Sequence, residues 1–318
     1  MMRTDERDRP RVVQIDARHA GQRIDNYLLT ALKGVPKSHI YRLLRKGQVR
    51  VNKGRIKPLY RLQAGDMVRI PPLRMASGPV PPNLSVEGKW RVPLEAAYLY
   101  EDEDLLVLNK PAGMAVHGGS GLSYGLIELL RQLRPDLPGI DLVHRLDRET
   151  SGCLLLSKSR QNLLALQQQF LAGTVNKRYL ALLQGRWQRG RQLVDQPLRK
   201  NRLQSGERMV HVDEAGKSAA TVFNPRRIFH DASLLDVELL TGRTHQIRVH
   251  AAWLGHPVAG DAKYGDSGFN RQMRGQGLKR LFLHAASIEL QQPRTGKALR
   301  IEAPWGNDLA AILAVLPE

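Results

Sequence analysis

The chain has 318 residues, of which 42% are hydrophobic and 25% charged. This composition excludes a wholly disordered protein and allows one large or two unequal globular domains. Lys and Arg number 49 against 30 Asp and Glu, so the net charge is +19 and the pI about 10.4. Residues 1–75 alone hold 18 basic and 6 acidic residues. A basic excess gathered in this part of the chain favours a polyanionic partner, with a solubilising surface charge as the alternative.

Several classes of protein are disfavoured by features that the sequence lacks. The single cysteine, Cys153, has no partner for an intramolecular disulfide, and a Cys-rich metal site is excluded. No apolar run is long enough to span a membrane, and residues 1–11 lack the apolar core of a signal peptide. We therefore expect a cytoplasmic monomer that does not associate with membranes.

The first quarter of the chain predicts a small α+β unit with a basic surface. Residues 1–11 form a charged tail that we expect to be disordered, and residues 12–72 form a compact domain. Apolar spacing and alternation predict helices at 21–29 and 38–46 and strands at 49–52 and 67–70. Ser38 can cap the second helix, and Gly47 can end it. The expected exposed faces carry Lys37, Arg42, Arg45, Lys46, Arg50, Lys53, Arg55 and Lys57.

A proline-rich stretch separates this unit from the rest of the chain. Residues 73–93 have prolines in or beside them and few apolar residues, which predicts a partly extended linker. Residues 94–318 predict a mixed α+β domain, because strands adjoin strands as often as helices and a regular parallel βαβ sheet is not expected. The expected strands are 105–108, 142–145, 153–157, 179–183, 233–239 and 281–284. The expected helices are 126–133, 161–171 and 244–254.

Asp147 is the first candidate for chemistry, in a polar segment between two apolar strands. The segment, residues 144–152, reads His-Arg-Leu-Asp-Arg-Glu-Thr-Ser-Gly. A polar turn between buried strands presents its side chains at a sheet edge. The neighbouring cations Arg145 and Arg148 favour an ionised carboxylate, as a nucleophile requires. The alternative is a salt-bridged turn without a catalytic role, and the pattern alone favours that alternative.

Arg243 lies in a second polar segment, residues 239–250, where a strand ends and a helix opens near Thr244. Such a helix start suits anion binding, and Arg243 can bridge to a carboxylate or a phosphate. His245 and His250 are five residues apart. That spacing does not place two metal ligands on one helix face, and no zinc-protease motif is present. We expect no metal site.

Two further segments complete the candidates. Tyr179 begins an alternating strand, for which a packing role is the alternative to a functional one. Residues 106–119 run from a strand through Asn109-Lys110-Pro111 into a glycine-rich loop. That loop lacks the third glycine of a dinucleotide-binding fingerprint and the lysine of a P-loop. We therefore expect no nucleotide cofactor.

Together these four segments resemble the motifs of the RluA-type family of pseudouridine synthases, in the same order. The N-terminal unit is similar to an S4-type RNA-binding domain, so the resemblance covers roughly residues 12–305. It implies the pseudouridine synthase fold, with a mixed, largely antiparallel sheet, in residues 94–318. The runs that further resemble family members acting on large-subunit ribosomal RNA are 33–38, 42–47, 116–123 and 204–208.

The resemblance implies that the protein isomerises uridines of 23S ribosomal RNA to pseudouridine without a cofactor or a metal. Asp147 is then the nucleophile on a flipped-out uridine, Arg243 pairs with it, and Tyr179 stacks on the uracil and later acts as a general base. Arg145 holds the flipped nucleotide or fills its place, and Ile247 lines the base pocket. The RNA-binding residues implied in the S4-like unit are Lys37, Arg42, Arg45, Lys46, Arg50 and Lys53.

Alternatives remain open. A non-enzymatic RNA-binding or ribosome-assembly protein would explain the basic first quarter, and it would tolerate Asp147→Asn. An S4-bearing methyltransferase or tRNA synthetase would need a cofactor loop or an ATP site, and the sequence provides neither. A pseudouridine synthase acting on another RNA is a third reading. The sequence also leaves open whether Asp147 attacks C1′, attacks C6 or acts by elimination.

Overall fold

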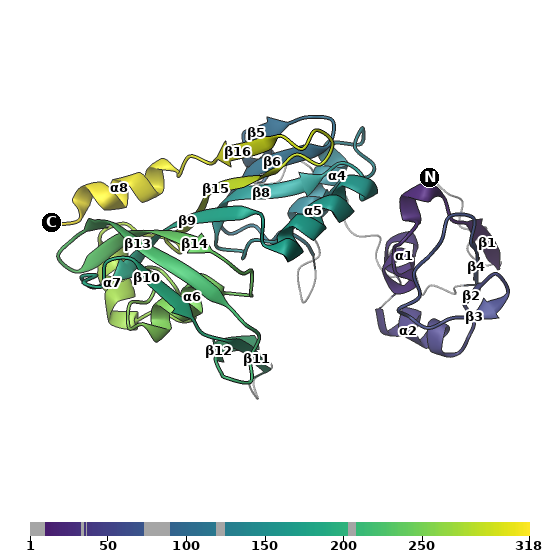
Figure 1. The fold of residues 1–318 in the computed structure, drawn as a ribbon, viewed down its shortest axis with the longest axis horizontal. Helices are drawn as coiled ribbons and strands as arrows, with labels where there is room; N and C mark the ends of the chain where they lie inside the picture. The colour runs from purple at the N-terminus through teal and green to yellow at the C-terminus, as the bar shows by residue number, and fades with distance from the viewer. Residues whose placement is uncertain (1–9, 33–34, 36, 73–89, 119–124, 203–207) are drawn as a thin grey trace. The chain divides into compact units, whose positions relative to one another are not determined.

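The structure, a computed structural model, describes residues 10–32, 35, 37–72, 90–118, 125–202 and 208–318 (Figure 1). The chain divides into two compact units, residues 1–85 and 86–318. Most of the expected linker, residues 73–89, lies outside the described part, and α3 (Arg91–Glu95) begins before the linker's expected end. Residues 1–9 of the expected tail also lie outside it, and Arg11 already belongs to the first strand.

The N-terminal unit is a four-stranded antiparallel sheet with two α-helices. Its elements are β1 (Arg11–Gln14), η2 (Ala17–His19), α1 (Ile24–Ala31), α2 (Lys37–Arg45), β2 (Arg50–Val51), β3 (Gly54–Arg55) and β4 (Met67–Ile70). The strand order is β1-β4-β2-β3. The buried Asp25 of α1 accepts a hydrogen bond of 2.6 Å from the Tyr41 hydroxyl of α2, which joins the two helices. Apolar residues of both helices and of the sheet share one core, so the α+β prediction is confirmed.

The larger unit is built on one mixed sheet of ten strands. The order is β10-β13-β14-β9-β15-β8-β6-β5, with β16 paired to β15 and β7 to β8. β15 and β8 are parallel, and the other pairs are antiparallel, which confirms the predicted sheet type. The strands are β5 (Tyr98–Glu101), β6 (Leu105–Lys110), β7 (Asp141–Leu142), β8 (Ser151–Ser157), β9 (Asn176–Gln184), β10 (Gln192–Asp195), β13 (Ala220–Ile228), β14 (Ala232–Leu239), β15 (Leu283–Gln291) and β16 (Ala298–Glu302). A separate hairpin is formed by β11 (Leu198–Arg202) and β12 (Arg208–Val212).

Helices cover the sheet in two groups (Figure 1). They are α4 (Leu126–Leu133), α5 (Arg160–Ala172), α6 (Gln246–Trp253), α7 (Ser267–Gly275) and α8 (Asn307–Val315). The apolar sides of α4 and α5 join those of β6 and β8 in the main core, whereas α7 and α8 pack with β9 and β14 in a second core. None of the helices in the described residues is long and apolar enough to cross a membrane.

The strand expected at 142–145 is shorter than the apolar pattern suggested. β7 ends at Leu142, and the chain leaves the sheet after Val143, whose N–H still donates to the Leu155 carbonyl at 3.2 Å. The side chain of His144 then supplies the acceptor that a neighbouring strand would otherwise supply: its Nε2 accepts the Leu155 N–H at 3.0 Å. Because a side chain satisfies this buried donor, residues 144–150 are free to form a loop.

Candidate active site

The loop that carries Asp147 is fixed at both ends. At its C-terminal end, Gly152 has φ +109°, and a Cβ there would overlap the backbone of Ala285 in β15. Only glycine therefore lets β8 start this close to its parallel neighbour. On the other side, Lys110 of β6 is fully buried, and its Nζ donates to the carbonyls of Met114 and Arg148 at 2.9 and 3.1 Å. These bonds tie the loop to the turn after β6.

Burial lowers the pKa of Lys110 to about 7, although the negative charges of Glu149 and Asp147 act in the opposite direction. The backbone carbonyls around Nζ supply dipoles in place of a carboxylate partner. Lys110 therefore stabilises the Asp147 loop from inside the protein. It is not among the residues that line the cavity beside that loop.

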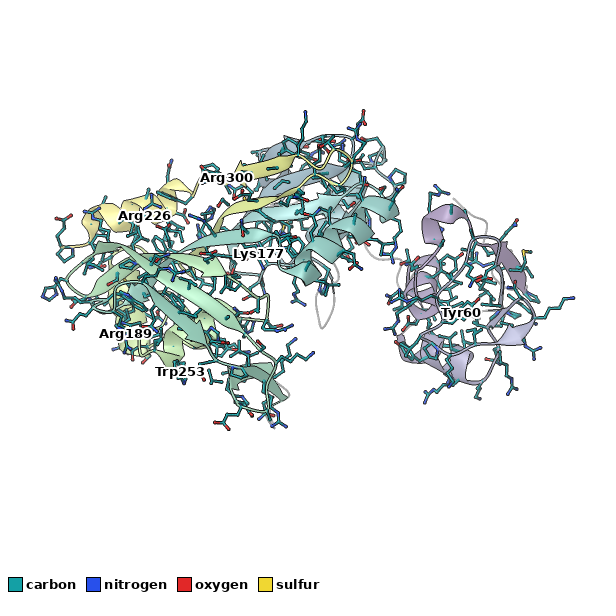
Figure 2. The ribbon with its side chains drawn as sticks, viewed as in Figure 1. Tyr60, Lys177, Arg189, Arg226, Trp253 and Arg300 are labelled. Carbon is teal, nitrogen blue, oxygen red and sulfur yellow. The ribbon has the colours of Figure 1, made fainter. Side chains whose placement is uncertain are left out.

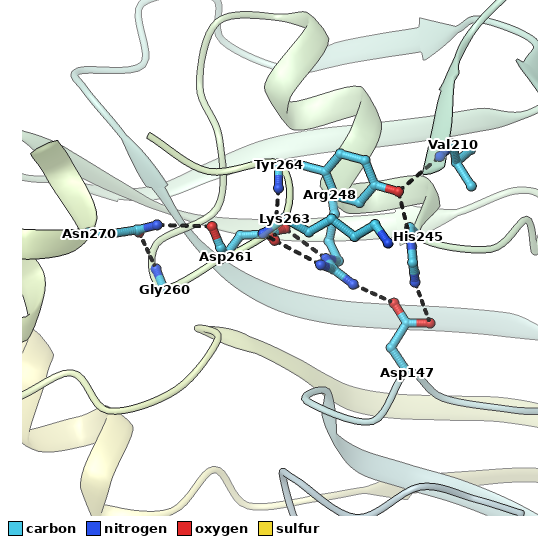
Figure 3. Close-up of polar contacts among 9 residues, drawn as sticks. All are labelled: Asp147, Val210, His245, Arg248, Gly260, Asp261, Lys263, Tyr264 and Asn270. Atoms are coloured by element: carbon cyan, nitrogen blue, oxygen red, sulfur yellow. Dashed lines mark hydrogen bonds and ion pairs between the residues drawn. The ribbon is translucent and has the colours of Figure 1, made fainter. Parts of the chain in front are cut away.

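Arg248 of α6 holds the Asp147 carboxylate. Its Nε and Nη2 each donate to the buried carboxylate of Asp261 at 2.7 Å, and its Nη1 donates to Asp147 Oδ2 at 3.3 Å (Figure 3). The guanidinium also lies over the ring of Tyr264, 5.1 Å from its centre. A bidentate bond to one carboxylate fixes the plane of the guanidinium, so the remaining nitrogen points at Asp147.

His245 faces the other oxygen of the same carboxylate. Its Nε2 lies 3.9 Å from Asp147 Oδ1, and its Nδ1 lies 2.8 Å from the Tyr264 hydroxyl. That hydroxyl accepts the Val210 N–H at 3.1 Å, and its own proton can be donated to Nδ1. In that arrangement the neutral imidazole carries its proton on Nε2, facing Asp147. Burial lowers the pKa of His245, which favours this neutral form. His245 is also in the left-handed region, at φ 55°, where a residue other than glycine is strained.

A cavity of about 280 Å³ opens beside Asp147. Tyr179 of β9, Ile247 of α6 and Leu283 of β15 supply apolar walls, and all three are buried. Lys177, also on β9 (Figure 2), lines the cavity too, and its Nζ lies 5.7 Å from the centre of the Phe170 ring. Burial and the nearby Asp147 charge raise the pKa of Tyr179, so this side chain keeps its phenolic proton at neutral pH.

The sequence-predicted residues of the larger unit meet at this cavity. Asp147, Tyr179, Arg145, Ile247 and Arg243 all line it, and Arg145 and Arg243 are exposed. Of the predicted residues in the S4-like unit, Lys37 has a side chain outside the described part. The others are exposed: Arg42, Arg45, Lys46, Arg50 and Lys53.

The predicted ion pair between Arg243 and Asp147 is wrong. Arg243 Nε donates to the Ser218 carbonyl at 2.9 Å, and Arg248 takes the expected place beside Asp147. Arg243 lies in the turn before α6, whereas Arg248 lies in the first turn of that helix, which begins at Gln246. Sequence reasoning missed Arg248. The available signal was an arginine in the first turn of a helix that is half apolar.

No group of three or more His, Cys, Asp or Glu residues within the described ranges is placed to hold a metal ion. The reactive centre consists instead of a carboxylate held between a guanidinium and an imidazole at the edge of an apolar slot. Such a slot suits a planar, uncharged ring, and the carboxylate suits nucleophilic or base chemistry on what the ring is attached to. The larger unit thus has the arrangement of an active site built around the Asp147 carboxylate.

Comparison with known proteins identifies the class. The model of the RNA pseudouridylate synthase family matches residues 104–253, and that of the S4 domain matches residues 22–68. Ribosomal large subunit pseudouridine synthase C of Pasteurella multocida is 55% identical over 311 residues, 97% of this chain and 94% of the relative. The protein of that name from Escherichia coli K12 is 53% identical, with 96% of each chain covered. The chain therefore belongs to the RNA pseudouridylate synthase family.

Solved structures agree with this assignment. The human RNA pseudouridylate synthase domain containing 1 is 27% identical, with a TM-score of 0.57 over 68% of this chain and 86% of that chain. Human RNA pseudouridylate synthase domain containing 4, at 24% identity and a TM-score of 0.58, shares the fold. The resemblance seen in the four motifs is confirmed, and so are the S4 domain and the enzyme class, an RNA pseudouridine synthase.

Proposed function

We propose that the protein converts specific uridines of large-subunit ribosomal RNA to pseudouridine, with Asp147 as the nucleophile. The observation that carries the proposal is the Asp147 carboxylate, held by Arg248 at the edge of a slot walled by Tyr179 and Ile247. The choice of RNA rests on the relatives over 50% identical along nearly the whole chain, whose names specify the ribosomal large subunit. We further propose that the enzyme acts as a cytoplasmic monomer, before or during assembly of the subunit.

The reaction breaks the N1–C1′ bond of uridine and joins C1′ to C5, while N1 gains a proton and C5 loses one. No atom or electron is gained overall. The base must leave the stack to reach Asp147, and the walls of the slot, Tyr179 and Ile247, offer it a ring face and an aliphatic side chain. Arg145, exposed at the slot's edge, is placed to hold the flipped nucleotide.

Arg248 and Tyr179 have separate roles in this scheme. The positive charge of Arg248 favours the ionised carboxylate that attack requires, and Arg248 contacts Oδ2 while Oδ1 faces His245 at 3.9 Å. A covalent bond from Asp147 to the substrate would consume the carboxylate charge. Because that charge helps to raise the pKa of Tyr179, the phenol would give up its proton more easily after the first step. That proton could pass to N1, which gains one, and the phenolate could then take the proton that C5 loses.

Mapping pseudouridines in ribosomal RNA from cells with and without the protein tests the proposal. We expect specific sites in the large-subunit RNA to be lost and to return with the wild-type protein. Asp147→Asn should not restore them, and it should release less than about 1% of the tritium that wild type releases from 5-tritiated uridine, because the amide is a far weaker nucleophile. Its RNA affinity should stay within a few-fold. If Asp147→Asn restored the pseudouridines, Asp147 would not be the nucleophile and the protein would act by binding RNA. If the lost pseudouridines were confined to another RNA, that RNA would be the substrate.

A further inference from the structure

We propose that a second cavity, next to the active site, binds the RNA backbone beside the target uridine. This cavity, called here the phosphate groove, has a volume of about 420 Å³ and lies between the β11–β12 hairpin, the 215–217 turn and the 242–244 turn. The inference rests on the proposed function, because it concerns how the same RNA is held.

The phosphate groove adjoins the catalytic cavity. Gly242, Arg243 and Thr244 line both cavities. Gly242 has open space where a side chain would stand, so this shared wall carries no side chain at that position. A strand whose uridine occupies the catalytic slot would then place its next phosphates toward the adjoining groove.

Among the residues that the structure describes, the groove is lined by cations and by no carboxylate. The cations are Arg199, Lys200, Lys217 and Arg243, and all four are exposed. Asp213, outside the lining, pairs with Arg199 at 3.3 Å. Lys200 and Lys217 make no ion pair with any residue that the structure describes, and Arg243 donates to a carbonyl. Within the described ranges, no carboxylate therefore neutralises Lys200, Lys217 or Arg243, and these charges can meet an anionic ligand.

The walls of the groove are built into the fold. Leu198 and Val210 of the hairpin are buried and pack with Val249 of α6. Leu198 and Lys217 exchange two backbone hydrogen bonds of 2.9 Å, which join the hairpin to the 215–217 turn. Val210 donates to the same Tyr264 hydroxyl that contacts His245. The hairpin is thus fixed relative to Asp147, so a ligand in the groove is held in register with the reactive carboxylate.

The chemistry fits phosphodiesters of a single strand. Phosphates carry permanent charge, attract unpaired lysines and arginines, and position a nucleic acid without reading its sequence. A uridine that has been flipped out leaves its neighbours unstacked, and their phosphates can follow the line from Arg243 to Lys217 and Lys200. An acidic peptide is the competing ligand, and the test separates the two.

The first test is the salt dependence of RNA affinity in the variant Lys200→Met/Lys217→Met. With a large-subunit ribosomal RNA transcript, the slope of log affinity against log salt should become shallower by about 1.4, since each lost single-strand phosphate contact removes ~0.7. The matched control is Lys279→Met/Lys297→Met, which removes two exposed lysines of the same unit that line neither cavity. Its slope should match wild type. Equal slopes for the two variants would contradict the proposal that the phosphate groove binds the RNA backbone.

The second test locates the contact. Methylphosphonate linkages, which carry no charge, replace phosphates one at a time around the target uridine of a stem-loop, each beside a 2′-O-methyl nucleotide. The matched control has the 2′-O-methyl group and a normal phosphate. We expect one or two linkages next to the uridine to weaken wild type several-fold and Lys200→Met/Lys217→Met hardly at all. Equal losses for both proteins at every linkage would contradict the proposal and leave an acidic peptide as the ligand.

Tritium release by wild type on the same RNAs separates this proposal from the function on which it rests. Absence of turnover on any RNA would count against the proposed function, while the linkage scan would still report whether the groove binds phosphates. Normal turnover, with no linkage that weakens binding by wild type more than binding by the double variant, would contradict the phosphate groove and leave the proposed function in place. Urea unfolding of both double variants should match wild type, because the four lysines are exposed.

Discussion

Arg248 bridges two carboxylates, and this makes it the residue on which both stability and catalysis depend. Its partner Asp261 has a side chain that is fully buried, and it also accepts the backbone N–H groups of Lys263 and Tyr264 at 2.9 and 3.1 Å. Burial alone would raise the pKa of Asp261, but the hydrogen bonds and charge of Arg248 lower it overall. Removing the guanidinium leaves a buried charge without its counter-charge.

Arg248→Met should therefore lower the free energy of unfolding by about 3–5 kcal/mol. Adding Asp261→Asn should restore more than half of that loss, because the amide oxygen still accepts from the backbone and carries no charge. The single-turnover rate of the double variant should nevertheless stay roughly a hundredfold below wild type, since Asp147 lacks its cation. Urea unfolding and tritium release measure the two effects. A double variant with normal turnover would remove Arg248 from the reactive centre.

A second residue-scale prediction concerns His144. Burial, together with the charge of Lys177, lowers its pKa from 6.5 to about 4, because its Nε2 must stay unprotonated to accept the Leu155 N–H. The folded state thus binds fewer protons than the unfolded state. Its stability contribution is complete above pH 6.5 and is lost as the pH falls toward 4, with roughly 1–2 kcal/mol gone at pH 5.

The change is His144→Gln, whose amide oxygen can still accept from Leu155 but cannot titrate. Its free energy of unfolding should fall less than that of wild type between pH 7 and pH 5. His117→Gln, at an exposed histidine, is the control and should keep the wild-type pH dependence. The same pH dependence in all three proteins would show that folding does not lower the pKa of His144.

The sequence could identify Asp147 but not its partner. Asp147, Tyr179 and Ile247 belong to local patterns that a resemblance transfers position by position. The choice between Arg243 and Arg248 depends on the backbone turn at the left-handed His245, the residue before α6, and on the pairing of Arg248 with Asp261, thirteen residues further along the chain. Backbone conformation and long-range pairing leave no periodic signal in a sequence, and this is why the ion pair was assigned to the wrong arginine.

At the scale of elements, the sequence predicts most reliably those helices and strands that bury the most apolar surface. α4 runs over the expected residues 126–133, and its Leu126, Ile127 and Leu130 all face the core. β11, with the sequence Leu-Arg-Lys-Asn-Arg, has one apolar residue and gives no alternating pattern. It is a strand because β12 pairs with it along its whole length. The phosphate groove therefore lies on an element that composition could not reveal.

The junction between β8 and β15 gives a prediction at this scale. Gly152→Ala would place a Cβ into the Ala285 backbone at a left-handed φ, and neither strand can retreat without breaking the pairing that carries the Asp147 loop. We expect a loss of at least about 4 kcal/mol in the free energy of unfolding, or no folded protein. Gly275→Ala, at a position with open space, is the control and should lose less than about 1 kcal/mol. Equal stability of the two variants would contradict the structure at this junction.

For the whole molecule, most of the excess positive charge and the catalytic residues lie in different parts of the chain. Residues 1–75 carry an excess of 12 positive charges, and the residues of the catalytic cavity all lie beyond residue 140. Truncation should separate affinity from chemistry, and it should begin at residue 86, where the second unit begins. A cut at residue 94, the expected domain boundary, would remove Trp90, which packs against the main core beside Leu94.

Residues 86–318 alone should fold and should bind large-subunit RNA far more weakly than the full chain. The slope of log affinity against log salt should be shallower by at least about 2, because phosphate contacts from exposed lysines and arginines are lost. The single-turnover rate at saturating RNA should fall far less, since Asp147, Arg248 and Tyr179 remain in place. A full-length variant with Arg42, Arg45 and Lys46 all changed to Gln should reproduce part of the slope change. If the truncated protein kept the full slope, the S4 domain would not hold the RNA; if it were inactive at saturation but folded, the S4 domain would have to complete the active site.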